Sequence, residues 1–333
     1  MPTNRPVSSL AAAIELATDL KCLLLVLCSR WSNATPAVRE ARAAGARVIA
    51  VDVPPRARLP VLETDALLRR LPSPRSGDTV PTVFPPDTSM KRNLGLAVAH
   101  MLPWRTVLFL DDDIVTSADD VRAAAGLLRN YDAVGLENTG YPDNSVVYHA
   151  RRAAGERQDT FIGGGALLVP AGCGSHFPNV YNEDWFFLFD DIRAGRVALS
   201  GQAEQRRYDP FDRPARAREQ EFGDCLAEGL YALLDDRRDL ADAFELDFWR
   251  GYLALRADLI ADIDGRSARA DVRASLKASR EALAEITPER CVKFLAAWQR
   301  DRGTWSAFLG GLPERDDIAG ALRYLGLRPI GQE

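Results

Sequence analysis

Cysteine is scarce and scattered in this chain. The 333 residues include five cysteines, and no two of them form a Cys-x-x-Cys pair. An odd, scattered set does not suit a disulfide framework, and free cysteine usually behaves as a small buried hydrophobic residue. We therefore expect free thiols in a reducing compartment, and a cytoplasmic protein.

Long apolar runs are also lacking. The run Cys22–Cys28 is far shorter than the roughly 20 residues that a helix needs to cross a bilayer. It begins late in the sequence and lacks the charged-then-apolar opening of a signal peptide. We therefore predict a buried strand at this run and no transmembrane segment.

The chain has no excess of positive charge. Its 42 Lys and Arg residues are outnumbered by 47 Asp and Glu residues, which gives a formal net charge of -5. Nucleic-acid binding favours a basic balance, so we expect no nucleic-acid partner. A small anion remains compatible, because a metal ion and a few local cations can hold a pyrophosphate in an acidic protein.

Strands and helices alternate up to about residue 205. A strand at Lys21–Ser29, a helix at Pro36–Ala44 and a strand at Arg47–Val53 predict a parallel βαβ unit. Further helices are predicted over Ser8–Thr18, Glu63–Leu71, Ser89–Met101 and Ala118–Asn130 and from Asn182 onward, and further strands over Thr106–Leu110, Ala133–Leu136, Phe161–Pro170 and Arg196–Leu199. The fold class that follows is α/β.

The character of the sequence changes after this region. Asp209–Arg218 is rich in proline and arginine and predicts a linker or an ordered loop. The pattern from Glu219 to Leu327 is helical almost throughout. We therefore expect an α/β domain over residues 1–205 and a mainly helical extension over residues 206–333. The extension offers a surface for an acceptor, a partner or a possible homodimer.

Three consecutive carboxylates follow an apolar strand at Asp111, Asp112 and Asp113. A strand that ends in this way places them at the carboxyl edge of a sheet, where open α/β sheets bind ligands. Side chains two apart on an extended segment point the same way, so Asp111 and Asp113 are expected to face one ion. Carboxylate oxygens suit Mg²⁺ or Mn²⁺. The alternative is a solvated acidic turn.

Two cations and an amide precede these carboxylates by one helix. Lys91, Arg92 and Asn93 stand at a predicted helix N-terminus, where the backbone N–H groups and the helix dipole favour anions. Arg92 is suited to a bidentate phosphate contact. The alternative is a solvated Lys-Arg pair on the surface.

Downstream of the carboxylates lie a run of glycines and a second acidic pair. Gly163-Gly164-Gly165 permits a close approach of the backbone to a ligand, or else marks a bulge. Glu183 and Asp184 stand before Trp185. A carboxylate there can take a proton from an acceptor hydroxyl, and an aromatic face can pack on a sugar ring. The alternative is an exposed acidic start of a helix.

In order and spacing, these segments resemble a GT-A glycosyltransferase, most like the broad family 2 group. Residues 91–95 are similar to the family's R-N-x-G helix, and residues 107–113 to its D-x-D motif. Residues 163–169 are similar to its glycine-led acceptor strand, and residues 182–185 to its E-D motif. The resemblance covers roughly residues 20–205.

The resemblance implies a Rossmann-like mixed sheet and a metal-dependent sugar transfer. The donor would be a nucleotide-diphosphate sugar, the cofactor Mn²⁺ or Mg²⁺, and the acceptor a small molecule or a glycan. Asp111 and Asp113 would bind the metal, and Asp184 would be the general base with Glu183 beside it. His176 is a further candidate for a metal or phosphate contact. The donor side would be formed by Ser29, Arg30, Asp52, Arg92, Asn93, Asp112, Gly164 and Trp185.

Deprotonation of the acceptor on the face opposite the leaving group would invert the anomeric centre, although a retaining GT-A enzyme carries similar motifs.

Three different classes of protein share parts of this pattern. Asp111, Asp113 and Val115 also fit the nucleophile motif of a haloacid-dehalogenase-like phosphatase, but more than one α/β unit precedes them here. A nucleotidyltransferase would need a glycine-rich loop after Lys21–Cys28. A non-catalytic nucleotide-sugar-binding protein would be expected to have lost the carboxylates.

Overall fold

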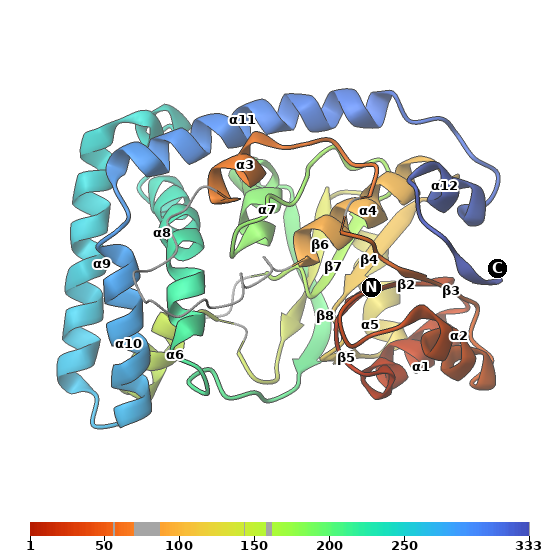
Figure 1. The fold of residues 1–333 in the computed structure, drawn as a ribbon, viewed down its shortest axis with the longest axis horizontal. Helices are drawn as coiled ribbons and strands as arrows, with labels where there is room; N and C mark the ends of the chain where they lie inside the picture. Colours follow the sequence, from red (N-terminus) through yellow and green to blue (C-terminus); the bar gives the residue numbers. More distant parts are fainter. Residues whose placement is uncertain (56, 70–86, 143, 158–161, 333) are drawn as a thin grey trace.

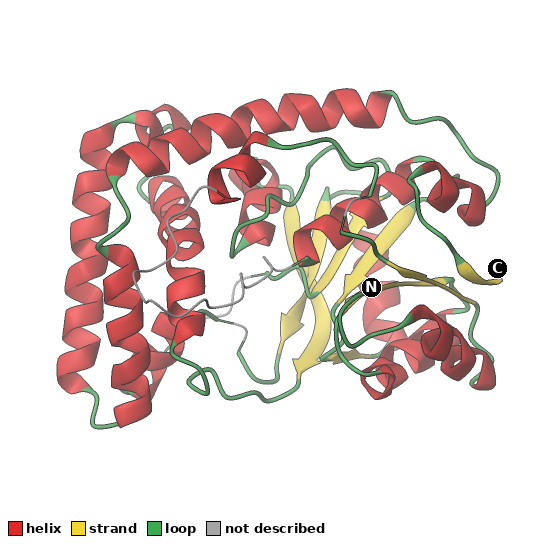
Figure 2. Cartoon of the chain, in the orientation of Figure 1, coloured by secondary structure: helices red, strands yellow, loops and turns green. Residues whose placement is uncertain are grey.

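The computed structural model describes residues 1–55, 57–69, 87–142, 144–157 and 162–332, and it is a mixed α/β protein with two sheets (Figures 1 and 2). The α/β class predicted from the alternating elements is confirmed. The end of the helix predicted at Glu63–Leu71 and the first residue of the strand predicted at Phe161–Pro170 lie outside the described residues.

The first sheet contains the predicted βαβ unit. Its strands run in the order β1 (Pro2–Thr3), β2 (Leu24–Cys28), β3 (Val48–Asp52) and β9 (Ile330–Gln332). Strands β2 and β3 pair in parallel, with helix α2 (Ala34–Ala43) between them in sequence. Strand β9 adds antiparallel to β3, so the C-terminal segment joins the same sheet as the N-terminal one.

The second sheet carries the acidic edge. Its strand order is β4 (Thr106–Leu110), β7 (Ala166–Pro170), β6 (Ala133–Asn138), β8 (Val197–Gln205) and β5 (Ile114–Thr116). Strands β4 and β7 are antiparallel, whereas β6 and β8 are parallel. This mixture of directions brings the start of β7 beside the end of β4, which positions the glycines next to the aspartates.

Helices connect and cover the strands. The α/β part contains η1 (Val7–Leu10), α1 (Ala11–Leu20), α3 (Glu63–Arg69), α4 (Thr88–His100), α5 (Ala118–Leu127), α6 (Val146–Ala153) and α7 (Glu183–Arg193). Helix α2 begins at Ala34 rather than Pro36, because Asn33 and not Thr35 is the N-cap. Helix α5 begins after Ser117, whose hydroxyl accepts a hydrogen bond from the N–H of Asp120 and caps the helix.

The extension is helical as predicted. Its helices are α8 (Ala215–Asp235), η2 (Leu240–Phe244), α9 (Leu246–Arg266), α10 (Ala270–Leu283), α11 (Pro288–Gly310) and α12 (Ile318–Tyr324). Helices α8 to α10 stand beside the sheet, and α11 runs along the top of the molecule toward α12 (Figure 1). The segment predicted as a linker or an ordered loop at Asp209–Arg218 is an ordered turn followed by the first residues of α8, which starts at Ala215.

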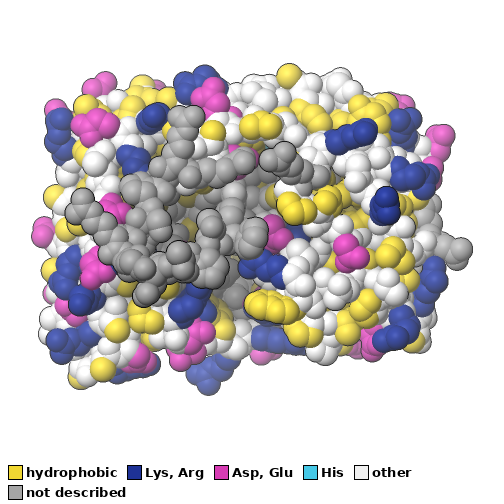
Figure 3. Space-filling model, in the orientation of Figure 1, with side chains coloured by type: hydrophobic (Ala, Val, Ile, Leu, Met, Phe, Trp, Pro, Cys, Tyr) yellow, Lys and Arg dark blue, Asp and Glu magenta, His cyan; other side chains and the backbone are white. Residues whose placement is uncertain are grey.

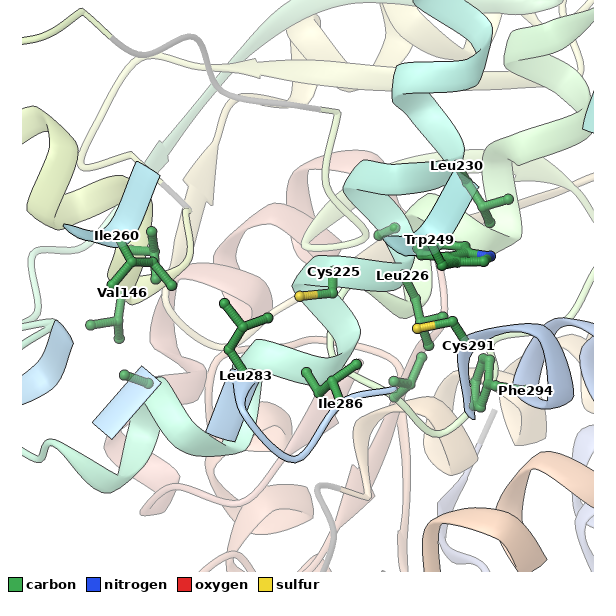
Figure 4. Packing of buried hydrophobic residues seen from close by; sticks show 14 of the residues in the cluster. Val146, Cys225, Leu226, Leu230, Trp249, Ile260, Leu283, Ile286, Cys291 and Phe294 are labelled. Carbon is green, nitrogen blue, oxygen red and sulfur yellow. The ribbon is translucent and has the colours of Figure 1, made fainter. Parts of the chain in front are cut away.

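The core of the extension is continuous with the α/β part. One buried cluster combines Phe186 and Phe189 of α7 with Leu230, Trp249 and Phe294 of three helices of the extension. Figure 4 shows how Cys225, Leu226, Ile286 and Cys291 pack in this cluster. The five cysteines are free thiols, and three of them are buried. The interior shared by α7 and the extension fixes how α8 sits on the α/β part.

Among the described residues, no helix is both long and apolar enough to cross a membrane. On the face drawn in Figure 3, basic and acidic side chains are interspersed over the surface of the described residues.

Candidate functional site

The acidic edge forms where β4 ends beside the glycines. The backbone N–H of Asp111 donates to the carbonyl of Gly165 (2.9 Å), which extends the antiparallel pairing of β4 and β7 by one step. A Cβ atom at Gly165 would lie 3.2 Å from Asp111 Oδ2, so a larger residue there would crowd the carboxylate. The local sequence therefore allows β7 to start directly against the acidic edge.

Arg92 lies at the centre of the site. Its guanidinium donates to both oxygens of Asp111 (3.0 and 3.1 Å) and to Glu183 Oε1 (2.7 Å), with only 4% of the side chain exposed. Burial by itself lowers the pKa of Arg92, but the charges of Asp111, Glu183 and Asp184 outweigh burial and raise that pKa. Arg92 is thus a fixed cation that joins α4, β4 and α7.

Gly164 holds the second acid. Its backbone N–H donates to Asp184 Oδ2 (2.6 Å), and the N–H of Trp185 donates to Asp184 Oδ1 (3.0 Å). A Cβ atom at position 164 would lie 2.4 Å from Nη1 of Arg92. The close backbone approach expected of the glycine run is therefore made, in this structure, by a guanidinium and a carboxylate of the chain itself.

Burial raises the proton affinity of both members of the acid pair. Burial raises the pKa of Glu183 to about 7, although Arg92 opposes that rise. Burial also raises the pKa of Asp184, against the opposing charge of Arg92 and the two backbone N–H donors. The two carboxyls stand beside each other and beside Asp111, so the loss of a proton from one makes the loss of the next harder.

An N-terminal arm reaches the same edge. The Thr3 hydroxyl donates to Asp112 Oδ2 (2.6 Å), and Arg5 donates to Asp113 Oδ2 (3.0 Å) while its other terminal nitrogen lies 3.4 Å from Asp112. Lys91 is buried, and its ammonium donates to the Thr3 carbonyl (2.8 Å), which fixes the arm. Thr3 and Arg5 were not predicted as site residues, because no local pattern links them to carboxylates 108 or 109 residues away.

The two predicted metal ligands form ion pairs with different arginines. Asp111 pairs with Arg92, and Asp113 pairs with Arg5. Within the described ranges, no group of three or more His, Cys, Asp or Glu side chains is arranged to hold a metal ion. Mg²⁺ is commonly held by one or two carboxylates together with substrate phosphates, so the oxygen donors of this edge fit such an ion by their chemistry. Binding through Asp113 would require Arg5 to move.

Three of the residues expected on the donor side, Ser29, Arg30 and Asp52, lie at the ends of β2 and β3. Ser29 accepts a hydrogen bond from the Lys91 ammonium (2.7 Å), and Arg30 has a left-handed backbone with a φ of 59°. Asp52 accepts from the N–H of Ala34 (2.7 Å) and so caps α2. Trp31 is 75% exposed at this edge, and no role was predicted for it.

Three other candidates contact the protein interior. Asn93 is buried and exchanges two hydrogen bonds with the backbone of Phe177 (2.8 and 2.9 Å), which gives it a structural role. The carbonyl of Trp185 accepts from the Tyr231 hydroxyl (2.9 Å), and the two rings meet edge to face. His176 lines a cavity of about 570 Å³ that also borders Pro170, at the end of β7 away from Gly165.

No family model matches the chain, and no curated protein matches it. A function must therefore be inferred from the geometry of this site.

Proposed function

We propose that the chain is a GT-A-type glycosyltransferase, which transfers a sugar from a nucleotide-diphosphate donor to an acceptor hydroxyl with inversion. The observation that carries the proposal is the convergence of Asp111, Glu183 and Asp184 on Arg92 at the carboxyl edge of β4. These residues come from three motifs whose order resembles the family, and they are adjacent in space.

Asp184 is the proposed general base. Two backbone N–H groups fix its carboxylate, and its raised pKa makes it a stronger base than an exposed aspartate. The acceptor hydroxyl gives its proton to Asp184 while its oxygen bonds to the anomeric carbon. On the opposite face, the bond from that carbon to the nucleotide diphosphate breaks, and the diphosphate leaves with the electron pair.

Glu183 and Arg92 contribute to the electrostatic environment of the proton transfer. Arg92 remains charged, and it holds Asp111 and Glu183 in place through direct hydrogen bonds. Asp111 and Asp113 would hold Mn²⁺ or Mg²⁺, with Arg5 displaced from Asp113. When bound, the cation neutralises charge that develops on the departing diphosphate.

The test is a thermal-shift panel of UDP-, GDP- and dTDP-sugars, each with and without Mn²⁺ or Mg²⁺. A ligand that binds only the native state raises the melting temperature by mass action. We expect a metal-dependent rise with sugars of one base, lost in Asp113→Ala and kept in Asp119→Ala. Asp119 is a matched control, because its side chain is 93% exposed and pairs only with the nearby Arg122 in the described structure.

The absence of a shift with every nucleotide, at concentrations far above a plausible affinity, would contradict the proposal. A metal-independent shift that survives in Asp113→Ala would keep the nucleotide site and reject the role of Asp113. Hydrolysis of a simple phosphate ester without any nucleotide binding would favour the phosphatase alternative.

A further inference from the structure

Helix α8 of the extension contacts the chain on both sides of the acid pair. On one side, a Cβ atom at Gly223 would lie 2.2 Å from the carbonyl oxygen of Tyr181, so the α8 backbone lies directly against the loop before α7. On the other side, Tyr231 donates its hydroxyl to the Trp185 carbonyl (2.9 Å). Glu183 and Asp184 lie between these two contacts in sequence.

A third contact acts on the residue immediately before the pair. Asn182 has a left-handed backbone with a φ of 61°, and it is the N-cap of α7, but its side chain makes no capping bond. Instead, the Asn182 amide donates to Asp224 Oδ1 of α8 (2.9 Å). The direction in which α7 leaves the loop, and with it the direction of both acids, is therefore linked to α8.

Asp224 is itself immobilised by a buried charge cluster. Arg256 of α9 donates to Asp224 Oδ2 (3.0 Å), and it also donates to Glu221 and to Glu228 of α8. The side chains of Arg256, Glu221 and Asp224 are at most 1% exposed. Buried polar and charged groups with satisfied hydrogen bonds have few alternative arrangements, so this cluster forms a rigid support for the bond to Asn182.

We propose that the helical extension is part of the catalytic apparatus, with Asp224 and Tyr231 as positioning residues that hold Glu183 and Asp184 in register with Arg92 and Gly164. Neither residue touches the reacting atoms. Asp224 acts through Asn182, and Tyr231 acts through the backbone of Trp185. The effect of these residues on turnover rests on the proposed function, whereas their effect on the position of Glu183 and Asp184 does not depend on it.

The test compares variants that remove the links and leave the fold in place. Asn182→Gly removes the bond to Asp224 and tolerates the left-handed backbone. Tyr231→Phe removes only the hydroxyl that reaches Trp185. Tyr148→Phe is the matched control, because its hydroxyl donates to Glu228 of the same cluster (3.0 Å) and is not bonded to residues 181–185.

The first measurement is amide hydrogen exchange of the full-length protein without ligand. Exchange in the peptide that covers residues 182–189 should be faster in Asn182→Gly and Tyr231→Phe, and unchanged in Tyr148→Phe. Exchange unchanged in all three variants, or equally faster in all three, would overturn the proposal. This measurement is independent of any activity, so failure of the proposed function does not affect it.

The second measurement is turnover with whichever nucleotide sugar stabilises the wild type. We expect kcat to fall about 10- to 100-fold in Asn182→Gly and Tyr231→Phe, with donor affinity in the thermal-shift assay unchanged, because small misplacements of a catalytic group cost rates of this size. Equal losses of kcat and donor affinity, or a similar loss in Tyr148→Phe, would indicate a merely structural role. If no nucleotide sugar binds the wild type, the proposed function fails and the exchange result alone decides the positional claim.

Discussion

At the scale of single residues, the main feature of the site is one buried arginine that pairs with several carboxylates. Arg92 pairs with both Asp111 and Glu183, with Asp184 adding its charge nearby. Such a cluster cannot keep every carboxylate fully ionised without cost, because like charges in a poorly solvated place disfavour one another. The proton affinity of Glu183 is the measurable result.

The pH dependence of stability tests this directly. The pKa of Glu183 is about 7 in the folded chain, against an ordinary value of 4.5. The folded state therefore binds this proton more tightly than the unfolded state, so the added stability is complete below pH 4.5 and is lost as the pH rises through 7. In Glu183→Gln, the free energy of unfolding from urea titrations should fall less between about pH 5 and 8 than in the wild type.

The comparison cancels buried acids away from the pair, such as Asp224 with its pKa raised to about 8, because both proteins contain them. The difference between the two curves reports the titration of the acid pair, because Asp184 titrates together with Glu183. Parallel curves for wild type and Glu183→Gln across this range would contradict a raised pKa at Glu183.

A second prediction at this scale concerns Arg5, which forms ion pairs with Asp113 and Asp112. Its side chain is 45% exposed, so the ion pairs are worth only about 0.2–1 kcal/mol. Arg5→Ala should therefore bind Mn²⁺ alone up to about fivefold more tightly, as measured by calorimetry on the full-length protein.

The matched control is Arg122→Ala, which frees the exposed Asp119 and should leave Mn²⁺ affinity unchanged. Weaker binding in Arg5→Ala would mean that the arm supports the ion instead of competing with it. Mn²⁺ binding that persists in Asp113→Ala would remove Asp113 from the ligand set.

At the scale of elements, predictability follows the length of the local pattern. Strands β2, β3 and β4 are continuous apolar runs, and all three were predicted. Strands β1, β5 and β9 have two or three residues each, so they have no period to detect and exist because a neighbouring strand offers hydrogen bonds. Helix α6 was missed as well, although Ser145 caps it by accepting from the N–H of Tyr148.

The same reasoning separates the site residues that were predictable from the sequence from the contacts that were not. Arg92, Asp111 and Asp184 were predictable as candidates. Asp111 follows a predicted strand, and Arg92 and Asp184 lie near the starts of predicted helices, which are both places where ligands bind. Their mutual contacts depend on the antiparallel pairing of β4 with β7, which no local pattern encodes. The links from Arg5 to Asp113 and from Asp224 to Asn182 arise only when distant elements pack together.

At the scale of the whole molecule, the boundary expected near residue 205 divides the sequence by character but does not coincide with a gap in the core. Phe186 and Phe189 of the α/β part are buried against Leu230 and Phe294 of the extension. The chain then returns through α12 to place β9 on β3 of the first sheet. Removal of the extension would expose large apolar side chains and the edge of β3.

We therefore predict that a fragment of residues 1–205 does not fold cooperatively. Exposing a buried Phe costs about 1.5–3 kcal/mol. The cost for two such residues and their neighbours is therefore a large part of the free energy of unfolding of a typical domain. Thermal unfolding followed by circular dichroism should lack a sigmoidal transition, and size-exclusion chromatography should show aggregates. A chain that ends at Leu327 is the control, because it loses only β9 and should unfold cooperatively at a lower temperature. A monomeric fragment 1–205 with a sharp transition would show that the α/β part is an independent domain, and that α8 is an addition to a site which is already complete.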